Sequence, residues 1–158
     1  MFRGGIAIYS VSNLDNRDWP PIRHSVEGRR TEQNPCHAST RRQQKVGGFE
    51  IAGIVGTVLA AASKRCAIVL DGVISTAAGL LAYMIHPDIS GYLISGHKSV
   101  EKAQHAALEY MGLEPVIDFE MRLGEGTGAA LTIDIVDAAC RIMREMASFD
   151  EAGVSEKT

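Results

Sequence analysis

The chain has 158 residues, of which 46% are hydrophobic and 22% are charged, and its formal net charge is -3. This length suits one domain with a buried core, and the small negative charge gives no support for a general nucleic-acid binder. The cysteines, Cys36, Cys66 and Cys140, form no Cys-x-x-Cys pair, and the five histidines lack metal-ligand spacing. We therefore expect reduced thiols, a cytoplasmic protein and no metal site.

The first 45 residues differ in composition from the rest. Residues 1–46 carry a net charge of +4, and the remainder carries -7. Segment 12–45 contains three prolines and little apolar periodicity, which indicates a disordered or loosely attached leader. A basic arm that binds nucleic acid is the less favoured alternative. We place a domain boundary between residues 1–45, which we expect to be a basic, disordered leader, and residues 46–158. We expect no membrane partner because no apolar run reaches the ~20 residues of a membrane-spanning helix.

From residue 46 onward, helical and strand patterns alternate. The expected elements are a helix over 49–63, a strand over 66–70, a helix over 75–85, a strand over 92–94, a helix from an N-cap at Ser99 to Gly112, a strand over 116–119 and a helix over 129–147. Short connections between alternating elements predict an α/β fold, a partial doubly wound arrangement in which helices cover both faces of a parallel sheet with three strands.

Two expected helices carry apolar stripes. The stripe of the last helix is predicted to face the core and comprises Leu131, Ile135, Ala138, Ala139, Ile142 and Met146. Asp137 and Arg141 stand at the i, i+4 spacing of an ion pair on its other side. The helix after Ser99 is expected to bury Val100, Ala103, Ala107 and Met111.

Three loops follow the three expected strands, at 71–72, 95–99 and 124–127. Right-handed crossovers bring the carboxyl ends of parallel strands to one edge of a sheet, where ligands of such folds bind. Each loop contains small and polar residues. The convergence of these loops predicts a ligand site.

The third loop places Glu125 between glycines directly before the last helix. Glycine permits close approach of a ligand, and a helix that begins here directs its free N–H groups and positive dipole end at whatever occupies the loop. Glu125 is thus a candidate base facing an anionic or sugar-phosphate ligand. A glycine-rich turn with a solvated glutamate would have the same pattern.

Other loop residues have alternative roles. Asp71 could bind a ribose hydroxyl or orient a base, although Asp-Gly is also a common turn. Ser99 could contact a phosphate while it caps its helix. His97 could donate into the pocket or be solvated, and Thr127 would offer a hydroxyl and an N–H to an anion. No P-loop, Gly-x-Ser-x-Gly elbow or complete Gly-x-Gly-x-x-Gly is present, which argues against a P-loop NTPase, a hydrolase and a Rossmann dehydrogenase.

Four segments resemble one family of proteins, namely residues 46–52, 69–74, 97–102 and 113–131, above all the run RLGEGTGAAL from Arg122 to Leu131. The chain is similar in these segments to the nicotinate-nucleotide–dimethylbenzimidazole phosphoribosyltransferases, and the similarity covers about residues 46–155. The resemblance implies transfer of phosphoribose from nicotinate mononucleotide to 5,6-dimethylbenzimidazole in cobalamin lower-ligand synthesis, giving α-ribazole phosphate without a metal or other cofactor. Glu125 stands where the family has its general base. The implied substrate-binding residues are Asp71, Gly72, His97, Ser99, Leu123, Gly124, Gly126 and Thr127.

The chain also departs from the family. Family members are about twice as long, and residues 1–45 contain no counterpart of their phosphate-binding loop, their second acidic residue or much of their benzimidazole pocket. Gln104 stands where a glycine is expected before His105. We therefore expect an incomplete enzyme, with little activity alone, that pairs as a homodimer or with a separate N-terminal half. The alternative is an inactive remnant or interaction module that keeps the α/β fold.

Overall fold

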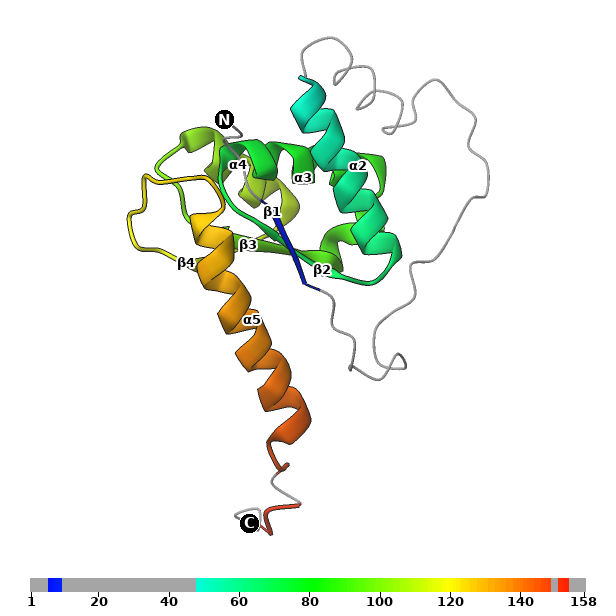
Figure 1. Ribbon diagram of the computed structural model, residues 1–158, viewed down its shortest axis with the longest axis vertical. Helices are drawn as coiled ribbons and strands as arrows, with labels where there is room; N and C mark the ends of the chain where they lie inside the picture. Colours follow the sequence, from blue (N-terminus) through cyan, green and yellow to red (C-terminus); the bar gives the residue numbers. More distant parts are fainter. Residues whose placement is uncertain (1–5, 10–47, 149–150, 154–158) are drawn as a thin grey trace.

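The computed structural model describes residues 6–9, 48–148 and 151–153 (Figure 1). Four strands, four α-helices and one 3-10 helix make up these ranges. In chain order they are β1 (Ile6–Tyr9), α2 (Phe49–Ser63), β2 (Ala67–Leu70), α3 (Val73–Ile85), η1 (Pro87–Tyr92), β3 (Leu93–His97), α4 (Lys102–Met111), β4 (Pro115–Ile117) and α5 (Thr127–Glu145).

The described strands form one sheet in the order β1-β2-β3-β4. Strands β2, β3 and β4 run parallel, which confirms the predicted α/β fold, while β1 joins the edge of β2 in the antiparallel direction. Strand β1 comes from the segment that we expected to be a disordered leader. The rest of that segment, residues 10–45, lies outside the described residues. The expected disorder there and the domain boundary after residue 45 stay predictions.

One face of the sheet is closed by α2, α3 and α4 with an apolar core. Ile68 and Leu70 alternate along β2 and so point to this face, where both are fully buried. They pack against apolar and small residues of the helices, among them Val58, Ala62 and Ala78. The apolar run that predicted β2 is continuous because Val69, between Ile68 and Leu70, is also buried, toward the other face of the sheet.

The other face is covered by α5, which packs closely on β3. Thr132 donates its hydroxyl proton to the Gly96 carbonyl over 2.9 Å. A Cβ on Gly96 would lie 3.0 Å from the Leu70 carbonyl oxygen and 3.3 Å from the Ala129 nitrogen. Helices therefore lie on both faces, as predicted, and the second face is packed through small and polar residues.

Some predicted boundaries agree with the structure, and others differ from it by one or more residues. Helix α2 has the predicted bounds, and α3 ends before Pro87 because proline cannot continue the helix. Strand β3 extends through His97, so Ser95 and Gly96 belong to a buried strand and not to a loop. Helix α4 begins at Lys102, with Glu101 and not Ser99 at its N-cap.

The predicted buried face of α4 was wrong in part, because Met111 is buried as predicted whereas Ala103 is exposed. Its buried residues are Gln104, Leu108 and Met111. Val100, 48% exposed, precedes the helix. The polar side chain of Gln104 takes the inward position because backbone groups of the sheet edge provide its partners. Gly112 ends the helix in the left-handed conformation with φ 67°, as its position predicted.

The predicted stripe of α5 is exposed. Its large residues have exposed fractions between 44% for Ile135 and 71% for Met146. The face that meets the sheet instead carries Gly128, Ala129 and Thr132. The prediction failed because the stripe has the periodicity of a buried surface, whereas no described element covers it. On another side of the helix, Arg141 and Asp137 form the predicted ion pair, with Nε and Oδ2 separated by 2.8 Å.

Two further sequence features can be compared with the described residues. Cys66 and Cys140 are free thiols and are partly buried. None of the helices in the described ranges is long and apolar enough to cross a membrane.

Candidate functional site

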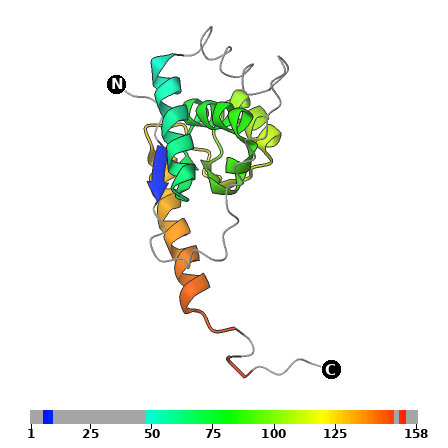
Figure 2. The same ribbon diagram turned by 90° about the vertical axis from the view of Figure 1, so that its right-hand side faces the viewer.

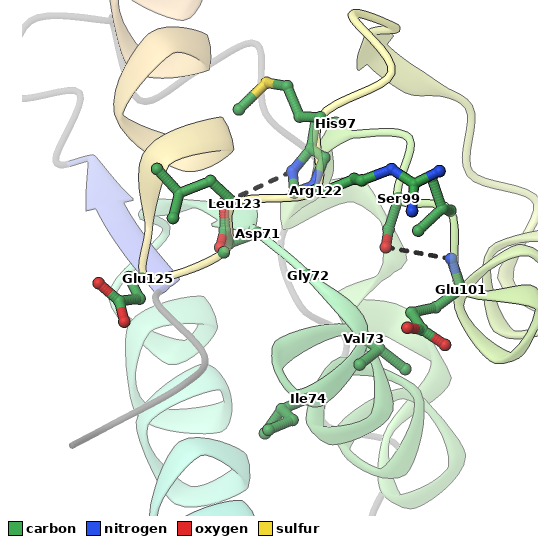
Figure 3. Close-up of a pocket in the computed structure, with 13 residues that line it drawn as sticks. Asp71, Gly72, Val73, Ile74, His97, Ser99, Glu101, Arg122, Leu123 and Glu125 are labelled. Carbon is green, nitrogen blue, oxygen red and sulfur yellow. Dashed lines mark hydrogen bonds and ion pairs between the residues drawn. The ribbon is translucent and has the colours of Figure 1, made fainter.

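A pocket of about 480 Å³ lies where the parallel strands end. Its walls are the loop after β2, the segment between β3 and α4, and the loop between β4 and α5 (Figure 3). The volume falls in the range that holds small molecules and nucleotides. The predicted convergence of three loops is thus confirmed. The lining residues are Asp71, Gly72, Val73, Ile74, His97, Ser99, Val100, Glu101, Met121, Arg122, Leu123, Gly124 and Glu125.

The glycine-rich loop makes a tight turn into α5. Glu125 and Gly126 are consecutive left-handed residues, with φ 63° and φ 88°. A left-handed glutamate is strained, since its Cβ crowds the backbone, and such strain persists where surrounding contacts hold it. The Gly124 carbonyl accepts both the amide proton of Thr127, over 3.3 Å, and its hydroxyl proton, over 2.9 Å. Thr127 is therefore engaged in the turn and does not line the pocket.

Asp71 holds this turn in place. Its buried carboxylate accepts the Gly126 N–H over 2.9 Å and the Ala129 N–H over 3.0 Å. These amides belong to the start of α5, whose dipole also favours a negative charge. The sequence predicted free N–H groups facing a ligand here. The carboxylate from the end of β2 occupies them instead, so the structure places Asp71 as a support of the Glu125 loop.

His97 lies beside Asp71 and is 2% exposed. Its Nδ1 is 3.5 Å from Asp71 Oδ1, without hydrogen-bond geometry, and has no hydrogen-bond partner within the described parts of the chain. A Cβ on Gly128 would collide with the imidazole ring, so only glycine allows α5 to approach His97 this closely. The histidine is a buried wall of the pocket and not a solvated loop residue.

Gln104 joins the segments that form the pocket. Its side chain is fully buried, and its Nε2 donates to the carbonyl oxygens of Asp71 and His97, each over 3.1 Å. Its Oε1 accepts the Ser99 N–H over 2.7 Å. Thr76 Oγ1 is a longer third acceptor at 3.4 Å. One amide therefore fixes the ends of β2 and β3 and the start of the segment before α4.

Three charged side chains of the pocket have no hydrogen-bond or ion-pair partner among the described residues. They are Glu101, Arg122 and Glu125. Figure 3 shows Glu125 on one side of the pocket and Arg122, Ser99 and Glu101 on the other, with Asp71 and His97 between them. The Ser99 hydroxyl accepts the Glu101 N–H over 3.2 Å. This arrangement places a carboxylate at one side of the pocket and a cation at the other.

Most of the residues that the sequence singled out come together here. Seven of nine line the pocket, namely Asp71, Gly72, His97, Ser99, Leu123, Gly124 and Glu125, whereas Gly126 and Thr127 form the turn behind it. Sequence reasoning missed Arg122 and Glu101 as lining residues and treated Gln104 only as a departure. Arg122 could have been found, since it adjoins the predicted loop. The hydrogen bonds of Gln104 join residues that are far apart in the chain, so no short sequence pattern could have predicted them. Within the described ranges, no group of three His, Cys, Asp or Glu residues could hold a metal ion.

Comparisons with known proteins agree on one family. A phosphoribosyltransferase family model matches residues 22–154, beginning inside the segment that we expected to be unmatched. A nicotinate-nucleotide–dimethylbenzimidazole phosphoribosyltransferase from Dehalococcoides mccartyi is 54% identical over 113 residues, which are 72% of this chain and 32% of that protein. The equivalent protein from Chloroflexus aurantiacus is 51% identical over the same shares.

Two solved structures from Thermus thermophilus are also similar. One, titled CobT, has a TM-score of 0.67 at 42% identity and covers 72% of this chain and 34% of that chain. The other, titled as the same phosphoribosyltransferase, has a TM-score of 0.70 at 40% identity, covering 75% and 36%. The chain therefore spans about a third of the length of the curated relatives it matches.

Proposed function

The chain belongs to the nicotinate-nucleotide–dimethylbenzimidazole phosphoribosyltransferase family, and on this premise we propose that its pocket serves phosphoribosyl transfer from nicotinate mononucleotide to 5,6-dimethylbenzimidazole. The product is α-ribazole phosphate, used for the lower ligand of cobalamin. Because the chain corresponds to a third of its relatives, we propose that it supplies the side of the site that carries the base. Further polypeptide, from a separate N-terminal part or a second copy, completes the site.

In the proposed reaction, a ring nitrogen of dimethylbenzimidazole attacks C1′ of the ribose with inversion. The bond between C1′ and the nicotinate nitrogen breaks, and Glu125 accepts the proton of the benzimidazole N–H. The observation that carries this role is the carboxylate of Glu125, which lines the pocket, has no partner among the described residues and stands on a strained turn that Asp71 holds. A base with no competing partner is available to a substrate proton, and a fixed turn limits its positions.

The remaining walls suggest how a nucleotide is oriented. Arg122 is the one lysine or arginine among the described residues that line the pocket, so we propose that it faces an anionic group of the substrate. Ser99, Gly72, Leu123 and Gly124 stay proposed contacts. Asp71 acts through the Glu125 turn, because both of its carboxylate oxygens already accept backbone protons. We place the reaction in the cytoplasm, in keeping with two free thiols among the described cysteines.

The second candidate is an inactive remnant or an interaction module. It is favoured by one observation, the short span of the chain relative to its relatives. The resemblance implies that family members carry a phosphate-binding loop in their first half. Residues 1–45 of this chain contain no counterpart of that loop. A chain without that loop could keep the fold and have lost the reaction.

The test is a chromatographic assay for α-ribazole phosphate from nicotinate mononucleotide and dimethylbenzimidazole. The purified chain is assayed alone and with the unmatched N-terminal part of the Dehalococcoides mccartyi relative, produced separately. We expect product in the second mixture, and a loss of about 10²- to 10⁴-fold for Glu125→Ala, the usual contribution of a general base.

Glu109→Ala serves as the control, because this glutamate is exposed on α4 outside the pocket. It should leave the rate unchanged. Product formation that survives Glu125→Ala would reject the assigned base. No product in either mixture would favour the remnant.

A further inference from the structure

Gln104 lies behind the pocket and is not one of the residues that line it. Its side chain is fully buried and projects from α4. Helix α4 lies on one face of the sheet, and α5, which begins directly after the Glu125 turn, lies on the other (Figure 2). The sheet therefore separates Gln104 from Glu125, and an effect of one on the other has to pass through the strand ends.

The amide of Gln104 bonds to backbone groups of the pocket wall. Its Nε2 has two protons and donates to the carbonyl oxygens of Asp71 and His97, each over 3.1 Å. Its Oε1 accepts the Ser99 N–H over 2.7 Å. Rotation of the amide by half a turn would set donors against that N–H and the acceptor against the carbonyls. The hydrogen bonds therefore fix one orientation of the amide, and with it the relative positions of three lining residues.

One series of hydrogen bonds leads from Gln104 to the side of the pocket that carries the base. Gln104 holds the Asp71 carbonyl, while the Asp71 carboxylate accepts the N–H groups of Gly126 and Ala129. These amides belong to the turn of Glu125 and to the start of α5. A shift of the Asp71 backbone would move its carboxylate as well, so the position of the Glu125 turn depends on Gln104.

A second series leads to the opposite side of the pocket. Gln104 accepts the Ser99 N–H, and the Ser99 hydroxyl accepts the Glu101 N–H over 3.2 Å. Figure 3 shows Ser99 and Glu101 beside Arg122, across the pocket from Glu125. Both sides of the pocket are thus connected to one buried side chain.

We propose that Gln104 is a positioning residue, which acts through Asp71 and Ser99 to hold the two sides of the pocket at a fixed separation. The proposal rests on the proposed function, because this separation affects a rate only if a base on one side meets a substrate held on the other. A misplacement of about 1 Å can lower a rate by about 10²-fold. The hydrogen bonds of Gln104 therefore contribute to the reaction as well as to the stability of the fold.

Two substitutions separate the two sides. Gln104→Met keeps the length of the side chain and removes its hydrogen bonds to Asp71, His97 and Ser99. Gln104→Glu keeps an acceptor for the Ser99 N–H but offers at most one proton to the two carbonyls. Ile89→Ala is the matched control, because Ile89 is 1% exposed in the apolar core and lies outside the pocket. Urea denaturation identifies conditions in which each variant remains folded.

Hydrogen exchange measured by NMR tests the connection without any substrate. We expect the Gly126 and Ala129 amides to exchange at least about tenfold faster in both Gln104 variants than in Ile89→Ala, because a buried hydrogen bond that holds Asp71 is lost. Global unfolding exposes all amides together, so a change confined to these amides reports the local connection. Equal exchange of these amides in the control would overturn the proposal.

The α-ribazole phosphate assay, with the added N-terminal part, tests the consequence for the reaction. For Gln104→Glu we expect kcat to fall about 10- to 100-fold with little change in the KM for nicotinate mononucleotide, because the Ser99 side keeps its hydrogen bond while the base is misaligned. For Gln104→Met we expect a similar fall in kcat and a higher KM, because both sides are released. Ile89→Ala should keep both values. A kcat of the Gln104 variants equal to that of the control would overturn the proposal.

The two measurements distinguish this proposal from the proposed function. If the unsubstituted chain gives no product while the Gln104 variants release the Gly126 and Ala129 amides, the transferase assignment fails and the connection between the two sides is supported. If product forms but the amides and kcat of the variants match those of Ile89→Ala, the proposed function stands and the positioning role of Gln104 is rejected.

Discussion

The two faces of the sheet are covered in different ways. On one face, α2, α3 and α4 bury a continuous apolar core around Ile68 and Leu70. On the other face, α5 is the one described helix that lies on β3, and it does so through small side chains and one hydroxyl hydrogen bond. The first face is complete within the described chain, whereas the larger apolar residues of α5 point away from the sheet.

The three helices on the first face contribute mainly to the stability of the fold. On the second face, small side chains allow α5 to pack close to the sheet. The core helices place the ends of β2 and β3, and those ends form the fixed side of the pocket. Helix α5 approaches closely enough for its first turn to bind the Asp71 carboxylate. The chain therefore buries most of its large apolar side chains on one face, whereas the other face is packed mainly through small side chains and hydrogen bonds. Substitutions on the two faces should have unequal effects.

The largest expected effect is on the core face. Leu70→Ala removes a fully buried side chain and leaves a cavity under α3, so it should lower the free energy of unfolding by about 2–5 kcal/mol. Leu131→Ala on α5, where the side chain is 45% exposed, should change it by less than about 0.5 kcal/mol. Urea denaturation measures both. Equal effects would show that the two faces do not differ.

Gln104→Leu should have the next largest effect. The substitution keeps the size of the side chain but removes its hydrogen bonds to Asp71, His97 and Ser99. Buried backbone groups then lose their partners, at a cost of roughly 2–4 kcal/mol in unfolding free energy. Thermal denaturation measures the loss, and Glu109→Ala on the exposed side of α4 serves as the control. A Leu variant as stable as the control would show that these bonds contribute nothing.

Asp71→Asn tests the hydrogen bonds on the α5 face. Asparagine keeps one acceptor oxygen, so either the Gly126 or the Ala129 amide loses its partner and the charge at the helix start is removed. We expect a loss of about 1–3 kcal/mol and faster hydrogen exchange of both amides. Unchanged exchange protection would mean that the carboxylate does not hold the turn.

The smallest effect concerns the exposed Lys98–Asp118 ion pair, whose Nζ and Oδ2 are 2.8 Å apart. The hydrogen bond and charge of Lys98 hold the pKa of Asp118 below its ordinary value. The stabilisation by this ion pair is thus present at pH values above the ordinary pKa of an aspartate. It is lost as the pH falls through the lowered pKa of Asp118. Lys98→Gln should raise the Asp118 pKa in an NMR titration with little change in stability, since solvent screens the pair. Lys102→Gln should not alter it.

Much of the fold and of the site follows from local sequence signals. The apolar run of β2, the Pro87 stop and Gly112 in the left-handed conformation are properties of a few adjacent residues, and the structure agrees with each. The position of Glu125 at the sheet edge also follows, because strand ends and the parallel order set that edge. Family membership followed from the motif around it.

Tertiary structure decided which surface of each helix is covered and which donor meets which acceptor. Asp71 and Ala129 are 58 positions apart, and Gln104 joins residues 7 and 33 positions away, so no local pattern encodes these bonds. Periodicity marked the α5 stripe as apolar but could not specify its partner, since a helix facing its own sheet and one facing another molecule have the same spacing. The sequence by itself therefore determined the elements and the candidate base. The supports of that base and the uncovered face of α5 exist only once the strands and helices are packed together.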